Sequence, residues 1–120
     1  MSLWTADVGE VIIKPEYRID FGYLFRGEYE EIECKLLSAY VEEYGDYLTP
    51  MERWSHMDYY KPEWKGKYST SYNEETGVFV YGCARNMHGM IGTFMHEFHD
   101  DILPAITETV VSYDGWIEDT

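Results

Sequence analysis

The spacing of apolar residues changes along this chain in a fixed order, and that order constrains the fold more than any other feature. Residues 8–14 (VGEVIIK) are rich in β-branched side chains and stop at Pro15, which predicts a strand. Residues 27–45 carry apolar side chains at steps of three and four, which predicts an amphipathic helix that ends at Gly45. Its apolar stripe consists of Tyr29, Ile32, Leu36, Tyr40 and Tyr44.

A short helix and a hairpin are predicted next. Residues 49–52 (TPME) combine a capping threonine, a proline at the first helical position and a glutamate, which together mark a helix start. That helix should end before Lys61, which precedes a proline. Residues 67–84 predict a hairpin that turns at residues 73–77, with Gly77 in the left-handed conformation that closes such a turn.

A second long helix is predicted for residues 90–107, followed by a last strand at residues 107–116. Pro104 should kink this helix or end it a few residues earlier, because proline has no amide proton to donate. The apolar stripe of the helix consists of Ile91, Phe94, Met95, Phe98, Ile102 and Ile106.

The resulting order is strand, helix, short helix, two strands, helix and strand. It matches the split β-α-β-β-α-β plan of a ferredoxin-like α+β domain. We therefore expect a four-stranded antiparallel sheet, two main helices on one face and a short extra helix, in one domain spanning residues 1–120. Since this architecture hosts many unrelated activities, it says almost nothing about function.

The charge of the chain limits its partners. Nine basic and 23 acidic residues give a net charge of −14, while aromatic residues at 18% argue against disorder. Binding to duplex nucleic acid or to an anionic membrane needs clustered basic residues, so both are disfavoured. Another protein with a basic surface suits this field better.

Acidic residues crowd the first predicted helix, and Glu31 and Glu42 are the candidate binding residues there. One interpretation is an outward, solvated face. The other is a partner-binding surface, whose spaced carboxylates could imitate the phosphates of a nucleic acid.

Histidines mark the second long helix. His96, His99 and Asp100 fall together on the side opposite the apolar stripe, where they could reach one cation. A zinc site needs three or four protein ligands, so His56 or His88 would have to complete it. The spacing does not match the HExxH motif of metalloproteases. The simpler interpretation is a solvated polar face, and we expect neither a metal nor another cofactor.

Residues 53–67 (RWSHMDYYKPEWKGK) are more basic than the rest of the chain, because they hold four of its nine basic residues. Trp54, Tyr60 and Trp64 are interleaved with these cations and are candidate binding residues. The segment could be a lid over the edge of the core, a protein interface or, through stacking, a contact for single-stranded nucleic acid.

The predicted strand that follows the turn is apolar on both of its faces. Val78, Val80 and Ala84 alternate with Phe79, Tyr81 and Cys83. If both helices cover one face of the sheet, the other face needs a cover from residues 53–67, from a second copy or from another protein.

No motif for a catalytic nucleophile or a phosphate-binding loop occurs. Cys34 and Cys83 form no CxxC pair, and we interpret them as free thiols of a cytoplasmic protein, with one long-range disulfide as the alternative. The first residues do not resemble a signal peptide, and no stretch is apolar enough to span a membrane.

We expect a small protein-binding module, an adaptor or inhibitor that occupies a basic surface. Its size, acidity and aromatic content are typical of accessory proteins of phages and mobile elements. Two other classes compete with this expectation. One is a small metal-dependent or ligand-binding enzyme that uses His96, His99 and Asp100, and the other is a homodimeric structural module.

Overall fold

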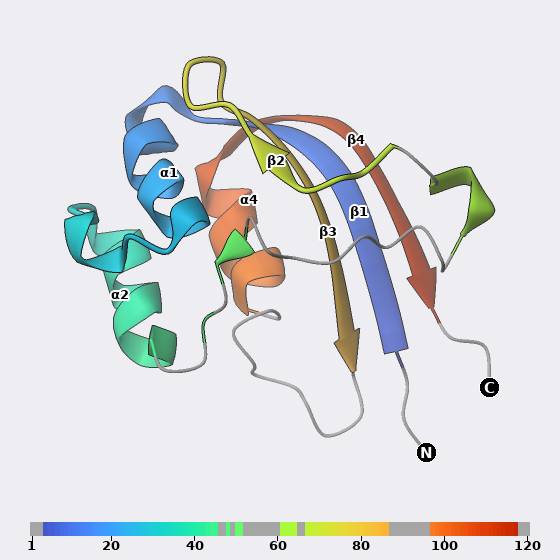
Figure 1. Ribbon diagram of the computed structural model, residues 1–120, viewed down its shortest axis with the longest axis horizontal. Helices are drawn as coiled ribbons and strands as arrows, with labels where there is room; N and C mark the ends of the chain where they lie inside the picture. The colour runs from blue at the N-terminus through green and yellow to red at the C-terminus, as the bar shows by residue number, and fades with distance from the viewer. Residues whose placement is uncertain are drawn as a thin grey trace.

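A computed structural model of the chain describes residues 4–45, 48, 50–51, 61–64, 67–86 and 97–117. Within them four strands form one antiparallel sheet, drawn in Figure 1. The strands are β1 (Trp4–Ile13), β2 (Ser71–Tyr72), β3 (Val78–Asn86) and β4 (Thr107–Ile117). Their order in the sheet, β2-β3-β1-β4, differs from their order along the chain and places β1 and β3 at the centre.

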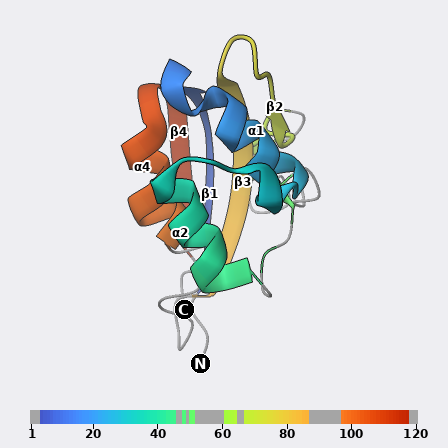
Figure 2. The same ribbon diagram turned by 90° about the vertical axis from the view of Figure 1, so that its left-hand side faces the viewer.

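Three α-helices of the described residues lie on one side of this sheet, as Figure 2 shows. They are α1 (Arg18–Arg26), α2 (Lys35–Tyr44) and α4 (Leu103–Ile106), the last preceded by a π-helical turn, η6 (Phe98–Ile102). Shorter 3-10 turns are η1 (Pro15–Tyr17), η2 (Tyr29–Glu31) and η5 (Pro62–Trp64). The predicted α+β class with an antiparallel sheet of four strands is confirmed. None of the helices described here is long and apolar enough to cross a membrane.

The predicted single helix over residues 27–45 is wrong. Gly27, with a φ of 82°, ends α1 instead of starting a helix, and its amide donates to the Leu24 carbonyl. The chain then passes through η2, and α2 begins at Lys35. The predicted apolar stripe still faces inward, because every one of its members belongs to or packs against the main core.

The second long helix is described only from residue 97 onward. Its stripe residues Phe98, Ile102 and Ile106 are buried as predicted, whereas residues 90–96 lie outside the described part. Pro104 does not end the helix, which runs on to Ile106; the irregularity is the π-helical turn before it. Most of the short helix predicted from residue 49 also lies outside the described residues.

The hairpin turn is confirmed. The Asn73 side chain accepts hydrogen bonds from the amides of Glu75 and Thr76, and Gly77 has a φ of 78°. Strand β2 pairs through only two residues, Ser71 opposite Val80 and Tyr72 opposite Phe79. This register turns Phe79 toward the helices.

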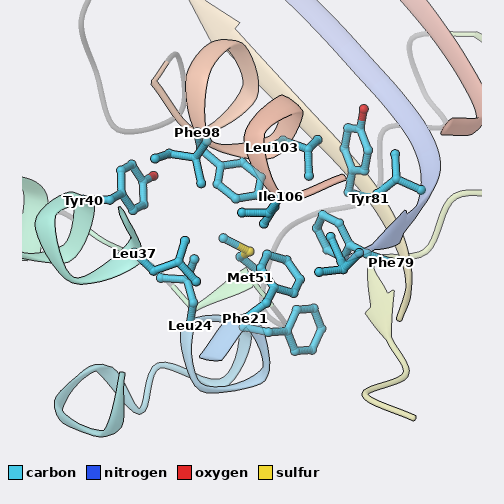
Figure 3. Close-up of a cluster of buried hydrophobic side chains, with 14 of the residues drawn as sticks. Phe21, Leu24, Leu37, Tyr40, Met51, Phe79, Tyr81, Phe98, Leu103 and Ile106 are labelled. Carbon is cyan, nitrogen blue, oxygen red and sulfur yellow. The ribbon is translucent and has the colours of Figure 1, made fainter. Parts of the chain in front are cut away.

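The main hydrophobic core fills the space between the sheet and the helices (Figure 3). Phe79 of β3 lies at its centre, with its ring centroid 4.8 Å from that of Phe21 and 5.3 Å from that of Tyr81. Leu37 and Ile106 close the core from α2 and α4. The core therefore ties the helices to the central strands.

A second, smaller core lies on the opposite face of the sheet. There Ala6 and Val8 of β1 are covered by Trp64 of η5, which is 2% exposed. The Trp64 indole donates a 2.8 Å hydrogen bond to Asp114 of β4, and the Lys61 ammonium lies 3.1 Å from both oxygens of that carboxylate. In Figure 1, η5 lies to the right of the sheet and the helices to its left.

Candidate functional sites

The two predicted acidic binding residues are both exposed, but they do not share one helix. Glu31 ends η2, before α2 begins, whereas Glu42 lies in the last turns of α2. The extended conformation at Cys34 separates the two segments. Within the described residues no ion pair includes either carboxylate.

A groove of about 270 Å³ opens between α2 and η6. Its floor is mostly apolar and consists of Leu36, Ala39 and Tyr40 from α2 and Ile102 from η6. The Tyr40 ring lies 6.2 Å from the ring of Phe98, so the bottom of the groove is continuous with the main core. The residues of this floor therefore also hold α2 against the main core.

Three carboxylates border this groove: Glu43 on α2, Glu97 immediately before η6, and Asp101 on η6. Partial burial raises the pKa of Glu97, and the charges of Glu43 and Asp101 raise it further. Burial and the same carboxylates raise the pKa of the Tyr44 hydroxyl. A side-chain hydrogen bond with Glu43 also raises the pKa of Glu97, and none of the ion pairs found among the described residues includes these three carboxylates.

His99 and Asp100, two of the predicted metal ligands, lie together in η6. The His99 Nδ1 atom is 3.1 Å from the Asp100 carboxylate, and its ring lies near the rings of Tyr81 and Tyr113. His96, His56 and His88 lie outside the described residues. Among the residues that are described, no three His, Cys, Asp or Glu side chains are grouped closely enough to hold a metal ion.

A buried aspartate adjoins this histidine. Asp7 of β1 is 4% exposed and accepts a short hydrogen bond from the Tyr113 hydroxyl of β4. Two glycines lie beside these hydroxyl groups: a Cβ at Gly9 would lie only 2.8 Å from the Tyr81 hydroxyl, and one at Gly115 would lie 3.3 Å from the Tyr113 hydroxyl. Asp7, Tyr113, Tyr81 and His99 thus form one polar cluster at the edge of the main core, with groups that could accept and donate protons.

Trp64, the only described member of the aromatic candidates, is inside the protein and packs over the sheet. Trp54 and Tyr60 lie outside the described residues. The lid interpretation of residues 53–67 therefore fits the part of the segment near Trp64. A binding role for any of these aromatic residues stays a prediction.

Several residues of these sites were not identified from the sequence. One is Asp7, which lies one residue before the strand predicted at residues 8–14. Glu97 and Asp101 lie beside the candidate metal ligands His99 and Asp100 in the sequence. Only the packing of α2 brings Glu43 to them. No local pattern predicts such an encounter.

A scan against protein-family models, a search of curated proteins and a search of solved structures each found no match.

Proposed function

We propose that this protein is a small acidic protein-binding module, an adaptor or inhibitor that occupies a basic surface of another protein. The observation that carries the proposal is the set of carboxylates on or next to η2, α2 and η6, which we call the acidic surface and of which Glu43, Glu97 and Asp101 meet at the groove. It consists of Glu30, Glu31, Glu33, Glu42, Glu43, Glu97 and Asp101.

Charge balance supports a basic partner. The whole chain carries −14, and none of the ion pairs found among the described residues gives a carboxylate of this surface a counter-charge. A basic surface would supply that charge and would be steered toward it over a distance set by the salt concentration. In the most specific version of the proposal, the carboxylates imitate a nucleic-acid backbone. An origin in a phage or mobile element remains part of the proposal.

Charge reversal tests this function. The variant Glu31→Lys/Glu42→Lys should bind a lysine- and arginine-rich peptide more slowly and with a weaker dependence on salt. A matched control is Glu63→Lys/Glu75→Lys, which changes the net charge equally at exposed positions outside the acidic surface. Equal losses in both variants, measured by stopped-flow kinetics at several salt concentrations, would reduce the proposal to a non-specific effect of net charge.

A ligand-binding or metal-dependent enzyme is the second candidate, favoured by the position of His99 beside the Asp7–Tyr113 hydrogen bond. A buried carboxylate, a phenol and an imidazole are sufficient for proton transfer to a small ligand. Elemental analysis of purified protein tests the metal-dependent form. Stoichiometric zinc that is lost in His99→Ala would place this function ahead of protein binding.

Homodimerisation is the third candidate, and the edge strand β4 supports it. Val110 and Val111 are 62% and 52% exposed on this edge. The sequence favours a dimer because one face of the sheet would otherwise be uncovered. Trp64 covers Ala6 and Val8 on that face, which weakens this argument. A dimer of acidic chains should tighten as salt screens their repulsion, which sedimentation equilibrium at low and moderate salt can measure.

Two further proposals, on the fold and on the location of the protein, accompany this function. A ferredoxin-like fold is supported by the central pair β1 and β3 and by helices on one face, although α1 and α2 stand where one helix was expected. A cytoplasmic location is supported by the free thiol of Cys34.

A further inference from the structure

We propose that the groove between α2 and η6 binds an arginine side chain presented by a protein partner. The proposal rests on the protein-binding function above and identifies where on the acidic surface such a partner is anchored. Its basis is the combination of an apolar floor with a border of three carboxylates from two helical segments.

The size of the groove limits its occupant. At about 270 Å³ it is smaller than the roughly 300–1,000 Å³ of most small-molecule sites. One long side chain fits this space better than a cofactor or a folded segment. Ala39 contributes to the floor, and its small side chain leaves room directly between Leu36 and Glu43 on α2.

The apolar floor and the acidic border of the groove would contact different parts of that side chain. Leu36, Tyr40 and Ile102 would contact an aliphatic stem, as long cationic side chains commonly lie on apolar surface with the charge at the rim. At the end of the stem, a positive charge would relieve the repulsion among Glu43, Glu97 and Asp101. Arginine and lysine both meet these two requirements.

The placement of the carboxylates on two separate segments favours a guanidinium over smaller cations. Glu43, Glu97 and Asp101 are all described, yet they are not close enough together to hold a metal ion. A guanidinium is planar, carries five N–H donors and is weakly hydrated, so it can bridge carboxylates that a single point charge cannot. Arginine therefore fits the groove better than lysine or a divalent metal.

Amide NMR spectra of the full chain, titrated with the peptide acetyl-Leu-Ala-Arg-Ala-Leu-amide, test this site. A single cation keeps non-specific attraction to the acidic protein small. We expect the amides of residues 36–43 and 97–102 to shift, with affinity about fivefold weaker for the citrulline peptide, which has the same shape without the charge. Lysine in place of arginine should also weaken binding. Equal affinity for the citrulline or lysine peptide would overturn the proposal.

Variants locate the effect. Glu97→Gln and Asp101→Asn should each weaken binding of the arginine peptide about two- to fivefold. Glu75→Gln is the matched control, because Glu75 is exposed and lies outside both the acidic surface and the groove. An equal loss in the control, or shifts confined to other residues, would refute the groove. If the lysine- and arginine-rich peptide still distinguished Glu31→Lys/Glu42→Lys from its control, protein binding would survive that failure.

Discussion

The two faces of the β-sheet are covered in different ways. The inner face packs against three helices through a core that contains Phe21, Leu37, Phe79 and Ile106. The outer face is covered at one place by Trp64, which contacts Ala6 and Val8 and is held by Asp114. One cover is broad and apolar, and the other is small and centred on Trp64, which a polar contact fixes and against which Tyr68 packs.

This difference shows how an acidic chain of 120 residues covers apolar side chains on both faces of one sheet. Helices supply most of the buried apolar area on the inner face, and that burial dominates folding. On the outer face the polar anchor sets the position of Trp64, because a hydrogen bond is directional where apolar contact is not. We expect the inner face to determine stability and the outer face to determine association.

The largest expected effect is at the centre of the inner face. Phe79→Ala should reduce the free energy of unfolding by about 3–5 kcal/mol, because it removes a ring in contact with Phe21 and Tyr81 and leaves a cavity. Val80→Ala, one residue further along and facing outward, should cost about 1 kcal/mol or less. Urea denaturation measures both, and similar losses would contradict the division between the faces.

The next effect concerns the outer cover. Trp64→Ala should reduce stability by roughly 2 kcal/mol, less than the loss at Phe79, because Trp64 has fewer apolar neighbours. It should also expose Ala6 and Val8 and increase self-association. Sedimentation velocity checks this second result. A variant that stays in the same association state as the wild type would show that the outer face needs no cover.

Acid should loosen the outer cover. Hydrogen bonds from Trp64 and Lys61 hold the pKa of Asp114 below its ordinary value of 3.8. A lowered folded-state pKa stabilises the protein above pH 3.8, and this stabilisation is lost as pH falls through the folded value. Trp64→Phe removes the hydrogen bond from Trp64, which lowers the pKa of Asp114 more than that from Lys61 does. The variant should therefore begin to lose this stabilisation at a higher pH than the wild type. Denaturation curves at a series of pH values, with Asp114→Asn as a reference that lacks this titration, measure the difference.

The smallest expected effect on stability concerns Glu97, on the side of the sheet that the helices cover, where the pKa is raised and not lowered. Burial, Glu43 and Asp101 raise the pKa of Glu97 above its ordinary value of 4.5, and Tyr44 is the other titratable group beside it. A raised folded-state pKa contributes stability below pH 4.5 that is lost as pH rises through the folded value. Glu97→Gln should therefore be more stable than the wild type at neutral pH by a few tenths of a kcal/mol, with no difference at low pH. Reduced stability at neutral pH would show that a cation already neutralises Glu97.

Much of this structure follows from local sequence. The hairpin turn depends on Asn73 and Gly77 within a few residues of each other. The inward positions of Leu36, Tyr40 and Tyr44 on α2 follow from helical spacing. Strand β4 begins at Thr107 as predicted, because β-branched residues take over where the helix ends. Such features need only contacts between residues close in the chain.

Gly27 shows where a local pattern becomes ambiguous. A glycine can stand before a helix or end one, and the sequence favoured the former. In the structure α1 occupies the residues before it, and Asp20 of that helix accepts a 2.9 Å hydrogen bond from the Cys34 amide at the start of α2. This contact between two helices places the start of α2 where no local capping residue does.

The sequence by itself determined the antiparallel α+β class, the hairpin, the apolar stripes and the acidity of the protein. Only the tertiary structure decided where α2 begins, that Trp64 covers the outer face, and that Glu43 meets Glu97 and Asp101 at one groove. The physical reason is distance along the chain. Periodicity and capping act between near neighbours, whereas the indole of Trp64 and the carboxylate of Asp114, 50 residues apart, meet only when the sheet and its covers have packed together.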